Sequence, residues 1–146
     1  MPAPSSDDLE PVIRGLQPGR FIGLDITDRF YELGRQRLGS LLTEKQVALA
    51  VVSRRTLREV GALNPDFVYS HRVLHHVPRR GLARYIRRIS SLLNERTTLV
   101  IENTPVVAPD GSIKGNRYSA EDIQPYLPAN WRCRQERFGL VATYHP

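Results

Sequence analysis

The segment Asp66–Glu102 constrains the fold of this 146-residue chain most, because its pattern changes from strand to helix and back to strand. Phe67–Tyr69 is a short β-prone run that follows the turn signal Asn64–Asp66. After Pro78, apolar residues recur at steps of three and four and predict one buried helix face, formed by Leu82, Tyr85, Ile86, Ile89, Leu92 and Leu93. Thr97–Ile101 is a β-branched run, typical of a strand buried on both faces of a parallel sheet. Two strands joined by a helix make a βαβ unit, so the sequence predicts an α/β fold.

Other parts of the chain predict elements that would join this unit. Further helices are expected at Asp7–Leu16, with Asp7 or Asp8 as cap, and from Thr27 or Asp28 to about Leu42. A short helix or a turn is expected at Arg55–Leu63. Further strands are expected at Arg20–Asp25 and at Val47–Val52, which is apolar throughout and therefore expected to be buried. Near the C-terminus, Ser119 and Asp122 form a capping-box pattern. Further on, the weakly alternating run Trp131–Arg137 is separated by Gly139 from a second run, Leu140–Tyr144.

Composition excludes several classes of protein. Apolar residues make up 40% and charged residues 25% of the chain, which is ordinary for a globular protein. No apolar run approaches the roughly 20 residues of a membrane helix, and no signal-peptide layout is seen, so we expect a cytoplasmic protein. The single cysteine, Cys133, excludes an internal disulfide and a cysteine-built zinc site. We expect no metal at His75 and His76, since adjacent side chains diverge and the spacing supplies no third ligand.

The positive charge has two interpretations. The net charge is +6, and 19 of the 21 basic residues are arginine. The densest group lies on the polar face of the helix after Pro78, without interleaved aromatic residues that could stack on bases. We therefore interpret these arginines as a solvated face, and a nucleic-acid partner is disfavoured.

Two segments, PGRFIGLDITDRFYELGRQRL and PDFVYSHRVLHHVPRRGLARYIRRISSLLNERTTLVIE, resemble class I S-adenosylmethionine (SAM)-dependent methyltransferases. The family often has Asp-aromatic-Val, a small polar residue, LHH, a proline, a helix ending in LL and a strand. The resemblance covers most of residues 18–102. It implies a Rossmann-like, mostly parallel sheet flanked by helices, with a C-terminal antiparallel hairpin. The length indicates a single domain over residues 1–146, which the resemblance makes methyltransferase-like, and the Pro- and Ser-rich residues 1–6 are expected to be flexible.

The resemblance implies SAM as the cofactor and assigns residues to it. Asp25 falls on the acid that binds the ribose hydroxyls, and Ile26 falls on a residue that lines the adenine. Ser53 follows the next strand, where the family has an acidic or small polar residue near the adenine, and no carboxylate stands there. By itself Asp25 is a weak signal, because dinucleotide enzymes share this acid and a helix cap or turn would also use it.

The resemblance also implies a substrate side. Ser70 falls in the loop that lines the cofactor, and His71 could act as a general base on an acceptor hydroxyl. The long connection at residues 103–118 is a candidate substrate loop, since long loops in compact domains are often functional. Within it, Asn103, Asn116 and Arg117 are candidates for polar contacts with the substrate.

One part of the family pattern is missing. A complete member begins with a strand and a loop of the type (Asp/Glu)-x-Gly-x-Gly-x-Gly before the first helix, whereas residues 1–6 read MPAPSS. We therefore expect a domain truncated by one strand, with weak cofactor binding. In the family the missing strand lies between those that correspond to Arg20–Asp25 and Asp66–Ser70. We expect these two strands to pair directly; the alternative is a strand supplied by a partner chain or a second copy.

Two functions remain in competition. The first is a SAM-dependent methyltransferase acting on a small-molecule acceptor. The second is a catalytically inactive methyltransferase-like module that acts by binding a protein partner. The sequence does not identify the acceptor or the atom that would be methylated.

Overall fold

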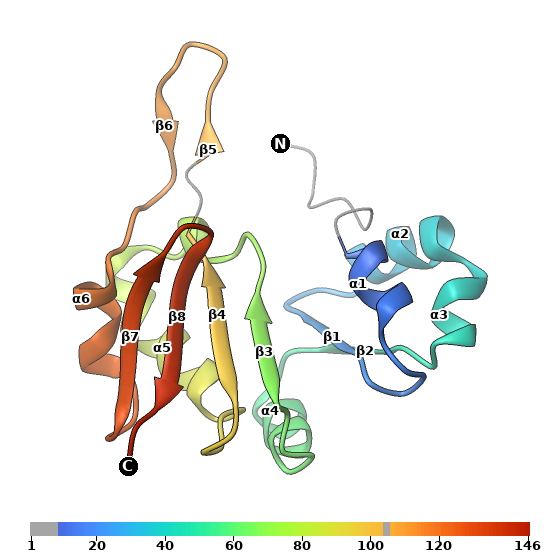
Figure 1. Ribbon diagram of the computed structural model, residues 1–146. Coiled ribbons are helices and arrows are strands. Elements are labelled where there is room, and N and C mark those ends of the chain that lie inside the picture. Colours follow the sequence, from blue (N-terminus) through green and yellow to red (C-terminus); the bar gives the residue numbers. More distant parts are fainter. Residues whose placement is uncertain (1–8, 104–105) are drawn as a thin grey trace. The chain divides into compact units, whose positions relative to one another are not determined.

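A computed structural model describes residues 9–103 and 106–146, and the chain divides into two compact units, Met1–Thr56 and Leu57–Pro146. Each unit contains a β-sheet of its own (Figure 1). The flexible N-terminus expected at residues 1–6 and the helix start expected at Asp7 or Asp8 lie outside the described residues. No helix in the described ranges has both the length and the apolar character needed to span a bilayer.

The first unit holds a two-stranded parallel sheet and three helices. Its strands are β1 (Ile22–Asp25) and β2 (Ala48–Val51). Its helices are α1 (Glu10–Gly15), α2 (Arg29–Leu38) and α3 (Ser40–Glu44). The single helix that we predict up to Leu42 is wrong, because Gly39 adopts φ +45° and separates α2 from α3. The prediction that the second strand is buried throughout is also wrong: Val51 is 42% exposed, since only one strand flanks it in this sheet.

Tyr31 of α2 joins the two strands of this small sheet. Its hydroxyl accepts a hydrogen bond from the Asp25 N–H at 2.6 Å and donates one to the carbonyl of Ala50. The side chain is buried, and burial raises the pKa of the Tyr31 hydroxyl, which therefore keeps its proton near neutral pH. The end of β1, where Asp25 lies, is thus held by a side chain as well as by the ladder.

The second unit holds a four-stranded sheet in the order β3-β4-β8-β7, visible as neighbouring arrows in Figure 1. Its strands are β3 (Phe67–Ser70), β4 (Thr98–Glu102), β7 (Trp131–Glu136) and β8 (Gly139–Tyr144). β3 and β4 are parallel, whereas β8 is antiparallel to both β4 and β7. The predicted C-terminal antiparallel hairpin is therefore confirmed.

Helices connect and cover these strands. α4 (Arg54–Gly61) precedes β3, and the connection from β3 to β4 contains two short 3-10 turns, η2 (Leu74–His76) and η3 (Arg79–Gly81), followed by α5 (Leu82–Ser90). This confirms the predicted βαβ unit. After β4 the chain forms α6 (Ala120–Ile123) and η4 (Gln124–Tyr126). The predicted capping box starts α6: the Asp122 N–H donates to Ser119 Oγ at 3.2 Å, and the Ser119 N–H donates to Asp122 Oδ2 at 2.9 Å.

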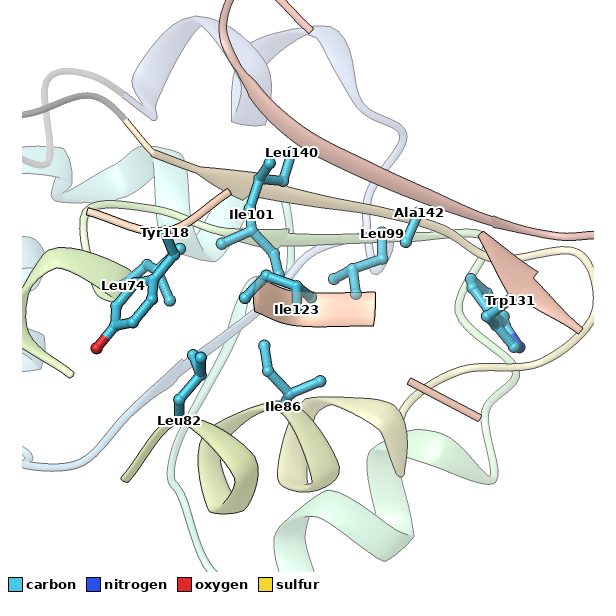
Figure 2. Packing of buried hydrophobic residues seen from close by; sticks show 10 residues of the cluster. All are labelled: Leu74, Leu82, Ile86, Leu99, Ile101, Tyr118, Ile123, Trp131, Leu140 and Ala142. Atoms are coloured by element: carbon cyan, nitrogen blue, oxygen red, sulfur yellow. The ribbon is translucent and has the colours of Figure 1, made fainter. Parts of the chain in front are cut away.

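The core of the second unit lies between α5, α6 and the sheet. Figure 2 shows Leu82 and Ile86 of α5 facing Ile123 of α6 and Leu99 and Ile101 of β4. Ile86, Leu99 and Ile123 have no exposed surface. Fully burying a side chain of this size contributes about 1.5–3 kcal/mol. The apolar face predicted for this helix is thus confirmed at its two most buried positions.

Part of the connection at residues 103–118 has structure of its own. β5 (Val106–Val107) and β6 (Ile113–Lys114) pair in an antiparallel hairpin, which extends beyond the end of the sheet in Figure 1. The turn residue Gly111 has φ +81°, and Asp110 accepts a hydrogen bond from the Ser112 N–H at 2.9 Å. The sequence predicts the turn but not the strands, which are only two residues long.

The direct pairing expected between the strands at Arg20–Asp25 and Asp66–Ser70 stays a prediction, because these strands lie in different units. Within the units, β1 pairs with β2 and β3 pairs with β4. The expectation assumed that an unpaired strand edge would be buried and therefore costly.

Candidate functional site

The carboxyl ends of β1 and β2 bring the predicted cofactor residues of the first unit together. Asp25 is the last residue of β1 and pairs with Val51, the last residue of β2. Ile26 and Ser53 follow these strands within two residues. Because parallel strands end at the same edge of a sheet, all three predicted residues lie along one edge, which is where ligands bind in open α/β sheets.

These three residues differ in what they offer a ligand. The Thr27 N–H donates to Asp25 Oδ1 at 3.2 Å, and no hydrogen bond from the described residues reaches the second carboxylate oxygen. Ile26 is 83% exposed, although its side chain is large and apolar. Ser53 caps α4, since its Oγ accepts the Thr56 N–H at 3.0 Å. One oxygen of the Asp25 carboxylate therefore stabilises the turn, and the other can accept a hydrogen bond from a ligand. The Ser53 hydroxyl, in contrast, already stabilises the start of α4.

The carboxyl ends of β3 and β4 carry a second cluster, in the second unit. Ser70 pairs with Ile101, so the residues that follow them, His71 and Glu102, lie side by side. His71 Nδ1 is 2.6 Å from Glu102 Oε2, and both side chains are 16% exposed. The Tyr69 hydroxyl donates to the same carboxylate oxygen at 3.1 Å. A carboxylate that accepts from Nδ1 leaves Nε2 as the basic nitrogen of the imidazole.

The second charge near this cluster belongs to Arg72. Its Nε lies 3.9 Å from Glu102 Oε1, and its backbone has φ +51°. The sequence analysis identified His71 but missed Glu102. The signal was present, because Glu102 ends a predicted strand that is parallel to the one leading into His71.

Ser70 is placed inside the fold rather than at its surface. It is 8% exposed, and its Oγ forms a hydrogen bond with the hydroxyl of Tyr85 on α5. Burial raises the pKa of Tyr85 to about 12. The Ser70 side chain therefore links β3 to α5, and only its backbone remains for a ligand contact.

His75 of η2 is the other buried histidine. It is 6% exposed, and its Nε2 is buried without a hydrogen-bond partner in the described part of the chain. Burial, and secondarily the adjacent His76, lower the pKa of His75, so the imidazole is neutral near pH 7. Its carbonyl oxygen accepts the Asn116 N–H at 2.9 Å. Asn116, predicted to contact the substrate, thus packs against η2.

The absence of a metal at the two adjacent histidines stays a prediction. Within the described ranges, no three side chains of His, Cys, Asp or Glu are grouped so that they could hold an ion.

An open cleft of about 530 Å³ lies in the second unit and begins at Asn103, the residue after Glu102. Its lining residues come from the end of β4, the segment before α6, α6 itself and the turn between β7 and β8; they include Asn103, Arg117, Ser119, Asp122, Arg137 and Phe138. Asn103 and Arg117 are predicted substrate residues, whereas Asn116 does not line the cleft. Arg137 and Phe138 were missed, because only the β4–β8 pairing brings them to this place.

Comparisons with known proteins identify the fold. No family model matches the sequence, and no curated protein matches it. Solved structures match with high probability. The pyocyanin biosynthetic protein PhzM is 14% identical with a TM-score of 0.65, over 97% of this chain and 48% of PhzM. PigF with SAH is 14% identical with a TM-score of 0.63, over 95% of this chain and 47% of PigF.

An O-methyltransferase family 2 protein from Planctomyces limnophilus, in complex with apigenin, is 15% identical with a TM-score of 0.58, over 87% of this chain and 44% of that protein. The chain spans about half the length of these three structures. At this level of identity the likeness concerns the fold. The mixed α/β architecture, with its parallel strands and C-terminal antiparallel hairpin, is the class I methyltransferase fold.

Proposed function

We propose that this chain acts as a SAM-dependent methyltransferase on a small-molecule acceptor. The observation that carries the proposal is the His71–Glu102 pair at the carboxyl ends of two parallel strands, 2.6 Å apart. The similar structures support it, since one is described with S-adenosylhomocysteine (SAH) and another with the small molecule apigenin. Catalytic inactivity, with binding of a protein partner, is the alternative, and no described contact favours it.

Residues of the first unit fit the adenosine part of the cofactor. An acid at the end of β1 can accept hydrogen bonds from two ribose hydroxyls, and Asp25 retains one such oxygen. The exposed Ile26 offers an apolar surface for the adenine ring. When bound, SAM supplies an electrophilic methyl group. The affinity is proposed to be low, because the contacts assigned to Asp25 and Ile26 serve only the adenosine part and none is assigned to the methionine end.

Residues of the second unit supply the base. His71 Nε2 accepts the proton of an acceptor hydroxyl, and the Glu102 carboxylate stabilises the imidazolium that results. The Tyr69 hydroxyl, 3.2 Å from Nδ1 and 3.1 Å from the carboxylate, helps to fix the orientation of both groups. Asn103 and Arg117 would position the acceptor from the adjacent cleft.

Titration calorimetry with SAH tests the cofactor assignment. We expect a dissociation constant above the micromolar range, and at least a ten-fold loss for Asp25→Ala. Asp25→Asn keeps the turn acceptor but removes the charge, so it separates folding from binding. Asp28→Ala is the matched control, because Asp28 is exposed and makes no side-chain cap bond. Absence of any SAH binding would instead favour the inactive module.

A further inference from the structure

The cleft beside β4 has a fixed position relative to the His71–Glu102 pair. It begins at Asn103, one residue after Glu102. In the ladder between β4 and β8, Glu102 pairs with Gly139, so the turn that carries Arg137 and Phe138 lies next to the end of β4. The two strands approach closely, because a Cβ at Gly139 would be 2.4 Å from the carbonyl oxygen of Ile101.

The charge of the cleft is positive. Arg117 and Arg137 are exposed and line it, and neither guanidinium is paired with a carboxylate of the described residues. The acid in the wall, Asp122, is already bound: it accepts the Ser119 N–H at 2.9 Å and pairs with Arg79 at 3.1 Å. These bonds lower the pKa of Asp122, so it stays ionised and paired near neutral pH. The two arginines that have no carboxylate partner among the described residues therefore make the electrostatic potential of the cleft positive.

The remaining lining is suited to a flat apolar group. Phe138 is 59% exposed, so its ring is accessible to a ligand in the cleft. Guanidinium groups bind carboxylates through paired hydrogen bonds and also stack on aromatic rings. The amide of Asn103 already donates to the Tyr118 carbonyl, which leaves its oxygen as an acceptor for a hydroxyl.

We propose that this cleft binds an aromatic acid, with the carboxylate on Arg117 and Arg137 and the ring against Phe138. The assignment of this acid as the methyl acceptor rests on the proposed function, in which a ring hydroxyl of the acceptor gives its proton to His71. The preference of the cleft for an aromatic anion does not depend on methyl transfer.

Calorimetry with 4-hydroxybenzoate and its neutral isostere 4-hydroxybenzamide tests the proposal. We expect the acid to bind at least about ten-fold more tightly than the amide, and Arg117→Gln and Arg137→Gln each to reduce acid binding by about ten-fold or more. Arg84→Gln on α5 is the matched control, since it removes an exposed arginine far along the chain and should change nothing. Equal affinity for acid and amide, an equal loss in the control, or no saturable binding would overturn the proposal.

A second comparison isolates the ring contact. Phe138→Ala should weaken the binding of 4-hydroxybenzoate more than that of cyclohexanecarboxylate, because only the aromatic ring can stack on Phe138. An equal loss of affinity for both acids would show that Phe138 does not contact the ring. SAH titrations on the same samples separate the two hypotheses. If the protein binds 4-hydroxybenzoate but not SAH, the proposed methyl transfer is refuted and the aromatic-acid site stands. If it binds SAH but does not prefer the acid over the amide, the aromatic-acid site is refuted and the proposed methyl transfer stands.

Discussion

Gly139, the first residue of β8, is the position where one added methyl group should cost most. Its φ is +155°, which L side chains rarely adopt, and a Cβ would lie 2.4 Å from the Ile101 carbonyl oxygen and 3.1 Å from the Glu102 Cα. Both neighbours are backbone atoms, so the strand itself has to move. We expect Gly139→Ala to cost about 1–2 kcal/mol for the backbone conformation and about 1–3 kcal/mol for overpacking. The free energy of unfolding should therefore fall by about 2–5 kcal/mol in total.

A second glycine separates the two contributions. Gly111, in the turn between β5 and β6, has φ +81°, but a Cβ there meets nothing within 4 Å. Gly111→Ala should therefore cost at most about 1–2 kcal/mol, the conformational part alone. Urea unfolding followed by fluorescence suits the comparison, because Trp131 is the only tryptophan, is 4% exposed and lies in the β7–β8 hairpin. Equal losses in the two variants would refute the argument from close approach.

Three further predictions concern the core, the pH dependence and the proposed base. Ile86→Ala should lower the free energy of unfolding by about 2–5 kcal/mol in urea titrations, because Ile86 is fully buried. Burial lowers the pKa of His75 below its unfolded value of about 6.5, so stability should be full above that pH and decline as pH falls below it. His75→Gln should flatten this decline, and His76→Gln should keep most of it; an unchanged slope in the first variant would contradict the assignment. Glu102→Gln should slow methyl transfer by about 100-fold or more, as expected when a general base loses its partner, whereas Glu32→Gln on α2 should not.

The sequence predicts most of the second unit because its signals are local or periodic. The step of three and four after Pro78 identifies the buried face of α5, and the β-branched run identifies β4. The capping box predicts the start of α6 from two residues alone. Each signal depends on one element at a time, and each is confirmed.

Features that depend on the relation between elements were harder to predict. The break at Gly39 needs a φ value that the sequence pattern does not show. Glu102 becomes a site residue only through the parallel pairing that places it beside His71. Ser70 and Asn116 have the polar character of ligand contacts, but each also forms a hydrogen bond inside the fold, Ser70 with Tyr85 and Asn116 with His75. A polar side chain near a strand end is thus weak evidence of a site until its partners inside the fold are known.

Both parts of the candidate site in the second unit depend on β4. Its parallel ladder with β3 brings Glu102 to His71, and its antiparallel ladder with β8 sets Glu102 opposite Gly139. A slip of the β4–β8 register by one residue would move Arg137 one step along the strand and turn side chains to the other face of the sheet. The close contact at Gly139 therefore also sets the position of the turn that carries Arg137 relative to Glu102. Gly139→Ala should accordingly lower both the stability and the preference for the acid over the amide, whereas Arg137→Gln should lower the acid preference alone. A Gly139→Ala variant that is destabilised but keeps its full acid preference would show that the cleft does not depend on the β4–β8 register.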